Sequence, residues 1–260
     1  MSVALVGSKR LNKHLIKLLK DDQDVQKLYL CCMNYKDVGS LVDEKTVIVD
    51  EDKVFKLKPN VVVEDIGAKR ALDIIRKSLE SCAHVVVVSA AVFSEKKVVE
   101  EVEALSGECK RYAVVPFGAL PAMDALEALS LDSLKDVSIW IRRSPEQLSN
   151  ILREAGLEPE GLNLPVTVYE GSALEELIKV KEDINTLMAA VLAGRLDPTT
   201  KIIADNMVSG SEYKIKMTSE VAEIEVKAKY KVLDKISEIM IYSVYRAVKR
   251  LLKGWGVVVL

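Results

Sequence analysis

Short apolar runs alternate with amphipathic segments through the first half of the 260-residue chain. The apolar runs predict strands at residues 4–6, 28–33, 46–49, 61–63, 85–89 and 112–115. Between them, residues 11–19, 68–79 and 94–105 place aliphatic side chains at i, i+3 and i+4, the spacing of a helix with one buried face. This alternation predicts an α/β domain in which helices cover both faces of a parallel sheet.

The pattern changes after Pro116. Residues 136–144, 165–171, 200–206, 211–219 and 222–232 alternate apolar and polar side chains with period two, which predicts half-buried strands. Residues 123–131 and 183–194 read as helices among them, so the second half is predicted to be an α+β domain with a mainly antiparallel sheet. The tail, residues 235–254, is one amphipathic helix whose expected buried positions are Ile241, Val244, Val248 and Leu251.

Composition excludes several classes of function. The chain has 37 basic and 39 acidic residues, a balance that argues against binding nucleic acid. The longest apolar stretch, residues 85–93, is shorter than the ~20 residues of a membrane helix, and no signal peptide precedes the first strand, so we expect a cytoplasmic protein. Two histidines and four cysteines without a C-x-x-C pair predict free thiols and no metal.

The first strand runs into a helix through "VALVGSKRLNKHL", which has the layout of a dinucleotide-binding turn. Of the three glycines of a G-x-G-x-x-G fingerprint only Gly7 is present, because Lys9 and Asn12 occupy the other two positions. Losing two charge-assisted hydrogen bonds of ~1.5–3 kcal/mol would weaken binding by roughly 10²–10⁴. The side chains of Ser8, Lys9 and Arg10 could instead hold an anion, but an ordinary turn with exposed basic residues explains them as well.

The second strand lacks the acidic residue that usually binds the adenosine ribose. Cys31, Cys32, Met33 and Asn34 occupy that region instead. Asn34 could bind a ribose hydroxyl, and Lys36 could meet a 2′-phosphate and so favour NADP, although a solvent-facing strand end explains both equally well.

Candidate residues for the other half of a coenzyme follow the fourth and fifth strands. Glu64 precedes a turn ending at Gly67, and Ser89 and Ala90 end the "VVVVSA" run. Both segments lie at the carboxyl edge of the predicted sheet, where folds of this kind place their ligands.

Several stretches, in this order and spacing, resemble the L-aspartate dehydrogenase family. They are "VVEDIGAKRALD", "HVVVVSAAVFSEK", "PFGALPAMDAL", "VTVYEGSALEEL", "DINTLMAAVLAG" and "KIIADN". The resemblance implies a Rossmann-type domain at residues 1–116 and 232–260 that binds NAD or NADP, and a substrate domain at residues 117–231 whose sheet forms a homodimer. It also implies oxidative deamination of L-aspartate without a metal.

The resemblance assigns substrate-side roles to three residues. Gly118 and Ala119 match the small-residue turn expected under the reacting ring, and Asn185 matches an asparagine before the apolar helix. Phe117 stands where the family usually has serine, so the expected pocket is narrower.

The catalytic histidine that the resemblance implies is missing. The family carries histidines shortly after the aspartate of "IIADN", whereas this chain has Gly210 and Tyr213 at the matching positions. Oxidation of an amine needs a base for its proton, and histidine suits that task near neutral pH. Asp205 and Tyr213 are the candidates that are left, and an exposed aspartate with a pKa near ~3.9 is a poor base.

Three functions are therefore compatible with the sequence. The first is an NAD(P)-dependent amino acid dehydrogenase with a reworked site. The second is a non-catalytic relative that binds an anion, a nucleotide or a protein partner, and the third is a structural role through the second-domain sheet. Because of the altered turn, we expect NADH and NADPH to bind weakly or not at all.

Overall fold

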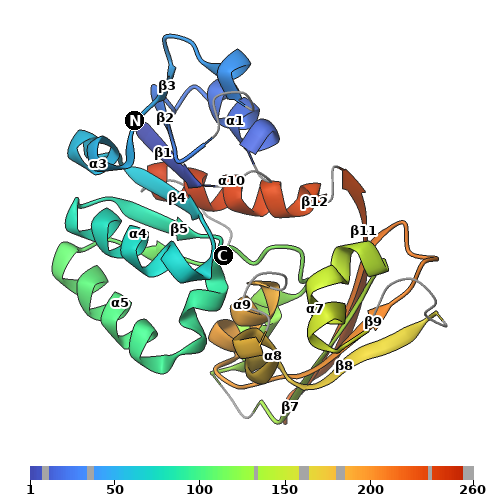
Figure 1. The fold of residues 1–260 in the computed structure, drawn as a ribbon. Helices are drawn as coiled ribbons and strands as arrows, with labels where there is room; N and C mark the ends of the chain where they lie inside the picture. The colour runs from blue at the N-terminus through green and yellow to red at the C-terminus, as the bar shows by residue number, and fades with distance from the viewer. Residues whose placement is uncertain are drawn as a thin grey trace. The chain divides into compact units, whose positions relative to one another are not determined.

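The computed structural model describes residues 1–7, 12–33, 38–131, 134–157, 164–179, 185–233 and 236–253. These residues form two compact units, the first from residues 1–116 with the chain after residue 240, the second from residues 117–240 (Figure 1). The return to the first unit falls at residue 241, not at residue 232 as the predicted domain limits have it. The reason is that β11 (Glu223–Leu233) pairs with β12 (Ile236–Ser237) and so extends the second sheet.

The first unit contains a six-stranded parallel sheet in the order β3-β2-β1-β4-β5-β6. Its strands are β1 (Ser2–Gly7), β2 (Lys27–Cys31), β3 (Thr46–Ile48), β4 (Val61–Asp65), β5 (His84–Val87) and β6 (Ala113–Val114). Val61, Val62 and Val63 are all buried, as expected of a parallel strand covered on both faces. The predicted Rossmann-type sheet is confirmed.

Helices pack on this sheet through the faces that the aliphatic spacing predicts. They are α1 (Asn12–Asp21), α3 (Glu51–Val54), α4 (Ala68–Glu80) and α5 (Lys96–Cys109), with a short 3-10 helix at Ala90–Ser94. In α4, Ala71, Ile74, Ile75 and Leu79 are buried at i, i+3 and i+4 intervals. Figure 1 shows α4 and α5 side by side.

The second unit contains a six-stranded sheet in the order β12-β11-β10-β7-β9-β8. Its other strands are β7 (Asp136–Arg143), β8 (Val166–Ser172), β9 (Thr199–Ala204) and β10 (Gly210–Thr218). Every neighbouring pair is antiparallel except β7 with β9. The mainly antiparallel sheet predicted from the period-two pattern is therefore confirmed.

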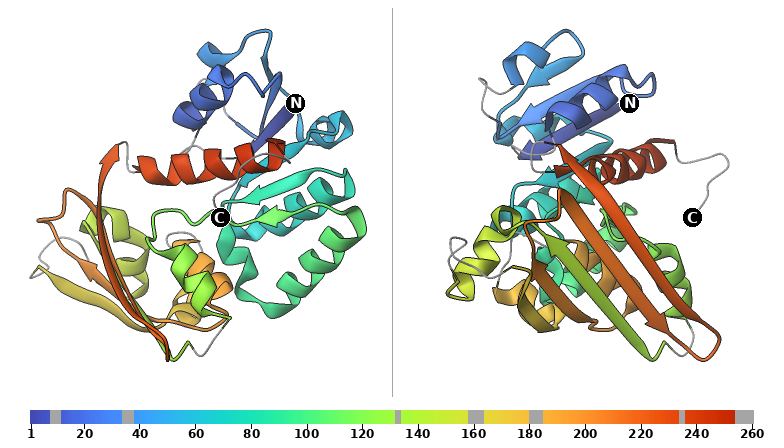
Figure 2. Two further views of the ribbon diagram at one scale, coloured as in Figure 1. Left: turned by 180° about the vertical axis from the view of Figure 1, so that it is seen from behind. Right: turned by 90° about the vertical axis from the view of Figure 1, so that its right-hand side faces the viewer.

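One face of this second sheet is covered by helices. They are α6 (Met123–Leu129), α7 (Ser149–Glu154), α8 (Ala173–Lys179) and α9 (Asn185–Gly194), and Figures 1 and 2 show α7, α8 and α9 on the same side of the strands. Val137, Ile139 and Ile141 are buried along β7, whereas the alternate residues Ser138 and Trp140 are partly exposed. The alternation of β7 thus separates a core face from an open face.

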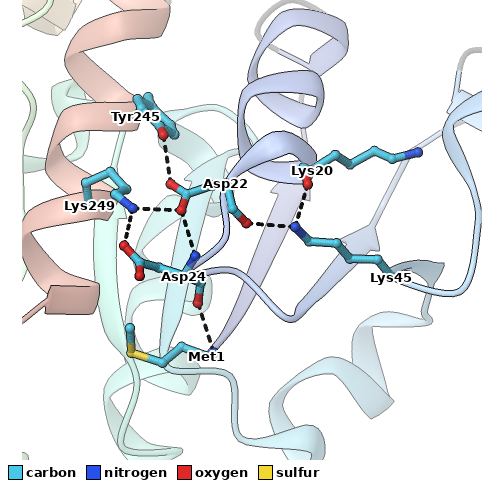
Figure 3. Close-up of polar contacts among 7 residues, drawn as sticks. All are labelled: Met1, Lys20, Asp22, Asp24, Lys45, Tyr245 and Lys249. Carbon is cyan, nitrogen blue, oxygen red and sulfur yellow. Dashed lines mark hydrogen bonds and ion pairs between the residues drawn. The ribbon is translucent and has the colours of Figure 1, made fainter.

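The C-terminal helix α10 (Glu238–Lys253) contacts the first unit through a polar cluster around the buried Asp22 (Figure 3). Lys249 and Tyr245 each donate a 2.7 Å hydrogen bond to the carboxylate of Asp22, and Lys249 also pairs with Asp24. Burial alone would raise the pKa of Asp22, but these hydrogen bonds hold it below its usual value. The buried carboxylate is thereby compensated, as a buried charge must be.

The apolar face of α10 differs from the prediction at one position. Ile241, Val244 and Val248 are buried as expected, but Leu251 is partly exposed and Leu252 is buried in its place. Both leucines lie within reach of the face that carries Val248, but Leu252 is nearer in helical phase to Ile241 and Val248 than Leu251 is.

Candidate functional site

Gly7 ends the central strand β1 at the point where the strand order reverses. β1 pairs with β2 on one side and with β4 on the other, which is where sheets of this type bind ligands. Gly7 has a φ of +87°, and a Cβ there would lie 2.7 Å from the carbonyl oxygen of Asp65. Only glycine fits this position. Ser8, Lys9, Arg10 and Asn34 lie outside the described residues.

Glu64 and Ser89 join the two loops that leave this edge of the sheet. One Glu64 carboxylate oxygen accepts hydrogen bonds from the Ile66 amide at 2.8 Å and the Ser89 hydroxyl at 2.7 Å. The other accepts from the Ser89 amide at 3.2 Å, and the Ser89 hydroxyl oxygen accepts from the Gly67 amide at 2.9 Å. The three bonds that involve Ser89 fix the turn after β4 to the segment after β5, and the bond from Ile66 orders the turn itself.

Glu64 is fully buried, and burial raises its pKa to about 7 against the hydrogen bonds that favour its ionised form. A carboxyl group with a pKa near neutrality can exchange a proton at physiological pH. Ala90, the other candidate in this segment, is buried directly after Ser89. The structure therefore brings Glu64, Ser89 and Ala90 together, and the backbone pairing of Gly7 with Asp65 places them beside the end of β1.

An acidic residue that the sequence analysis missed lies near the end of β2. The Cys32 thiol donates to the Glu51 carboxylate at 3.3 Å, and Arg70 and Lys77 donate to the same carboxylate. Partial burial would raise the pKa of Glu51, but these bonds lower it to about 2. Because Glu51 comes from α3, beyond the next strand, inspection of the β2 segment alone could not find it.

In the second unit, the turn at Gly118 and Ala119 packs against the start of α9. Gly118 has a φ of +67°, and a Cβ there would lie 2.8 Å from the Thr186 side chain. Ala119 is buried, and Asn185 is the first residue of α9. The three substrate-side candidates are thus near one another in the fold, because Thr186 directly follows Asn185.

Asp205 was expected to be exposed, but only 1% of it is accessible. Its carboxylate accepts a 2.7 Å hydrogen bond from the Met207 amide and pairs with the Arg142 guanidinium, which donates through Nε at 2.8 Å and through a second nitrogen. The Met207 amide and Arg142 hold the pKa of Asp205 below its usual value. An aspartate in this state is a poor acceptor of protons near neutral pH.

Tyr213, the second candidate base, is buried and held by Arg143. The Arg143 guanidinium donates to the phenol oxygen at 2.5 Å and lies 5.6 Å from the ring centroid. Arg142 and Arg143 are consecutive residues of β7, so they serve opposite faces of the sheet. The tyrosine hydroxyl is therefore already part of a structural contact.

At Gly210 the fold leaves no space for a side chain. Gly210 pairs with Lys231 of β11, and a Cβ built on it would collide with the carbonyl oxygen of Tyr230. A histidine cannot occupy this position unless β11 moves. The two histidines of the chain both belong to the first unit, where His14 is exposed on α1 and His84 begins β5.

These two sheets define a two-unit fold with a Rossmann-type unit and a mainly antiparallel α+β unit. Residues 124–251 match the family described as "Aspartate dehydrogenase, C-terminal". An L-aspartate dehydrogenase of Methanococcus maripaludis is 27% identical over 203 residues, covering 77% of this chain and 76% of that protein. The chain is thus similar to the L-aspartate dehydrogenases, and the match to their C-terminal domain family spans residues 124–251.

Solved structures agree with this fold. The crystal structure of aspartate dehydrogenase from Thermotoga maritima matches with a TM-score of 0.76 and 21% identity, over 100% of this chain and 99% of that one. GenD2 from gentamicin A biosynthesis, solved in complex with NAD, matches with a TM-score of 0.60 and 12% identity, over 100% of this chain and 88% of that one. Among the residues that the structure describes, no helix is long and apolar enough to cross a membrane.

Proposed function

We propose that the chain is a dehydrogenase-like protein that binds NAD or NADP at the carboxyl edge of its first sheet. Its substrate would be a small amino acid such as L-aspartate, or the corresponding keto acid. The observation that carries this proposal is the meeting of Gly7, Glu64 and Ser89 where the strand order reverses. The relation to the L-aspartate dehydrogenases supports the class of substrate.

Each of these residues has a defined task under the proposal. Gly7 lets bare backbone face the ligand, and the Glu64–Ser89 contact keeps the two coenzyme loops at a fixed separation. A bound nicotinamide ring would supply the hydride acceptor. The proton of the amine must then pass to a base or to water, and neither Asp205 nor Tyr213 is well placed to take it, because an arginine holds each of them.

That arrangement supports a second candidate function, a non-catalytic relative that binds a nucleotide or another anion. The ion pair of Arg142 with Asp205 and the blocked position at Gly210 favour it specifically. A titration and a turnover assay separate the two functions.

The titration measures the fluorescence of NADH and of NADPH as the full chain is added. We expect saturable binding, weaker than that of a protein with a full glycine fingerprint by roughly 10²–10⁴. Lys9→Gly should tighten binding, whereas Lys9→Gln, which removes the charge but keeps a side chain, should not. No binding of either coenzyme would overturn the coenzyme part of the proposal.

The turnover assay follows the absorbance of the reduced coenzyme in the presence of oxaloacetate and ammonia. We expect oxidation above the rate measured without ammonia. Binding without turnover would instead support the non-catalytic function.

We also propose that the chain forms a homodimer through the open face of the second sheet. This face carries Trp140, with the Lys214 ammonium 4.7 Å from its ring, and cross-strand ion pairs such as Lys201 with Glu170. Aromatic rings are common at the centre of protein interfaces. Light scattering should give twice the chain mass, and Trp140→Glu should reduce it to one chain mass; a monomeric wild type would contradict the proposal.

A further inference from the structure

Cys31 and Cys32 end β2 with their sulfur atoms only 3.2 Å apart. Consecutive residues of an extended strand point to opposite faces, which would separate the two thiols. Cys32, however, has a φ of +60°, in the left-handed region that residues with a Cβ seldom enter. This backbone turn at the end of the strand brings both thiols to one side.

The two thiols differ in their access to solvent. Cys31 is fully buried, so packing fixes its sulfur, whereas Cys32 is exposed. Glu51, which accepts the Cys32 hydrogen bond, is already paired with Arg70 at 2.6 Å and Lys77 at 3.1 Å. The Glu51 carboxylate is therefore already held in ion pairs. The sulfur atoms of Cys31 and Cys32 are the two candidate metal ligands.

We propose that Cys31 and Cys32 form a two-thiolate site for a soft monovalent cation of the Cu⁺ type. Soft thiolate ligands select such ions, whereas a structural zinc site needs four ligands. Within the described ranges, no group of three or more histidine, cysteine or acidic residues could hold a metal. Two ligands suffice for the soft ion, and the two displaced thiol protons pass to solvent.

The geometry favours this ion over a disulfide between the same residues. Two metal–sulfur bonds of ~2.3 Å span sulfur separations up to ~4.6 Å, and rotation of the exposed Cys32 side chain can widen the observed 3.2 Å. A disulfide usually needs Cα atoms at least ~4.4 Å apart, but consecutive Cα atoms are ~3.8 Å apart. A crosslink within the pair would therefore be strained and easily reduced.

The test is an anaerobic titration of the full chain with Cu⁺ in competition with a chromogenic Cu⁺ chelator. Every variant compared in this titration carries Cys82→Ser and Cys109→Ser, which remove the other two cysteines of the chain. We expect this protein to take one equivalent from the chelator, and the further change Cys32→Ser to weaken binding by at least ~100-fold.

Cys32 is the position to change because it is exposed, so its serine variant should keep the fold, which circular dichroism verifies; Cys31→Ser would disturb the core. Equal retention of Cu⁺ by the Cys32→Ser protein would overturn the proposal. Failure of the two-cysteine protein to compete with the chelator would overturn it as well. Both results are independent of NADH binding, so they do not depend on the proposed function.

Discussion

Glu64 in the first unit and Asp205 in the second are both buried carboxylates at the ends of strands, but the groups that contact them differ in charge. Glu64 accepts hydrogen bonds from neutral donors, the Ile66 amide and the amide and hydroxyl of Ser89. Asp205 is paired with the Arg142 guanidinium. Burial raises the pKa of Glu64 to about 7, since no cation among the described residues pairs with it to offset the lost hydration, whereas the Met207 amide and the Arg142 guanidinium lower the pKa of Asp205.

The difference shows which of the two carboxyl groups can change its protonation state near neutral pH. A carboxylate paired with arginine stays ionised across the physiological range, whereas one held by neutral donors in a buried place titrates within it. The first unit thus keeps an acid that titrates near neutral pH at the carboxyl edge of its sheet. In the second unit the acid stays ionised within its ion pair, and the sheet excludes a side chain at Gly210.

The largest expected effect comes from forcing a histidine into the second unit. Gly210→His should lower the free energy of unfolding by more than ~3 kcal/mol, because its Cβ meets the backbone of β11 and not a movable side chain. Urea unfolding followed by circular dichroism measures this.

Gly107→His is the matched control, since nothing lies within 4 Å of a Cβ at that position in α5. Its effect should stay within ~0.5 kcal/mol. If Gly210→His is as stable as wild type, β11 can move to make room for the side chain. A gain in turnover in the same variant would further show that the second unit is closer to an active enzyme than the comparison with Glu64 implies.

The next effect is a pH dependence caused by Glu64. Because its folded pKa is raised from 4.5 to about 7, its stabilising contribution is complete below pH 4.5 and is lost as the pH rises through 7. The loss is about 3 kcal/mol. Glu64→Gln cannot titrate, so its stability relative to wild type should increase by most of that amount between pH 5 and pH 8.

Glu51→Gln provides the control in the same unit. The pKa of Glu51 is lowered to about 2, so its contribution is lost only as the pH falls below 4.5. Its difference from wild type should therefore be flat between pH 5 and pH 8. A flat difference for Glu64→Gln as well would mean that Glu64 stays ionised in the folded protein and that the two carboxylates are alike.

Most of the fold could be predicted because its signals are local. Buried parallel strands such as Val61–Val63 are continuous apolar runs, and half-buried strands such as β7 alternate apolar and polar side chains with period two. The pattern of each strand therefore indicates how it is buried. The end of the second unit was less predictable, because it depends on pairing of β11 with β12 across a turn. Likewise, Leu252 and Leu251 differ only in helical phase.

The candidate site was predictable only for residues whose position follows from their own strand and from the parallel topology of the sheet. Gly7, Glu64 and Ser89 lie at the carboxyl ends of three strands of one sheet, so parallel topology brings them to one edge. Partners contributed by distant segments could not be foreseen. The approach of Glu51 to Cys32, the pairing of Arg142 with Asp205 and the collision of Gly210 with Tyr230 all depend on tertiary packing.

The smallest expected effect comes from breaking the ion pair of the second unit. Arg142→Ala leaves the buried Asp205 carboxylate without its cation, and we expect a loss of about 2 kcal/mol. This is less than for a fully buried pair, because the Arg142 side chain is 37% exposed and water screens part of the interaction. Thermal unfolding at pH 7 measures the loss.

Lys201→Ala breaks the Lys201–Glu170 pair on the same open face, where the partner glutamate is 57% exposed instead of buried, so about 0.5 kcal/mol is expected. If Arg142→Ala costs no more than Lys201→Ala, Asp205 gains nothing from its arginine, and the contrast with Glu64 fails. If Arg142→Ala instead loses stability but gains ammonia-dependent oxidation of NADH, then the ion pair keeps Asp205 from accepting protons. Asp205 would in that case be the catalytic base in place of the missing histidine.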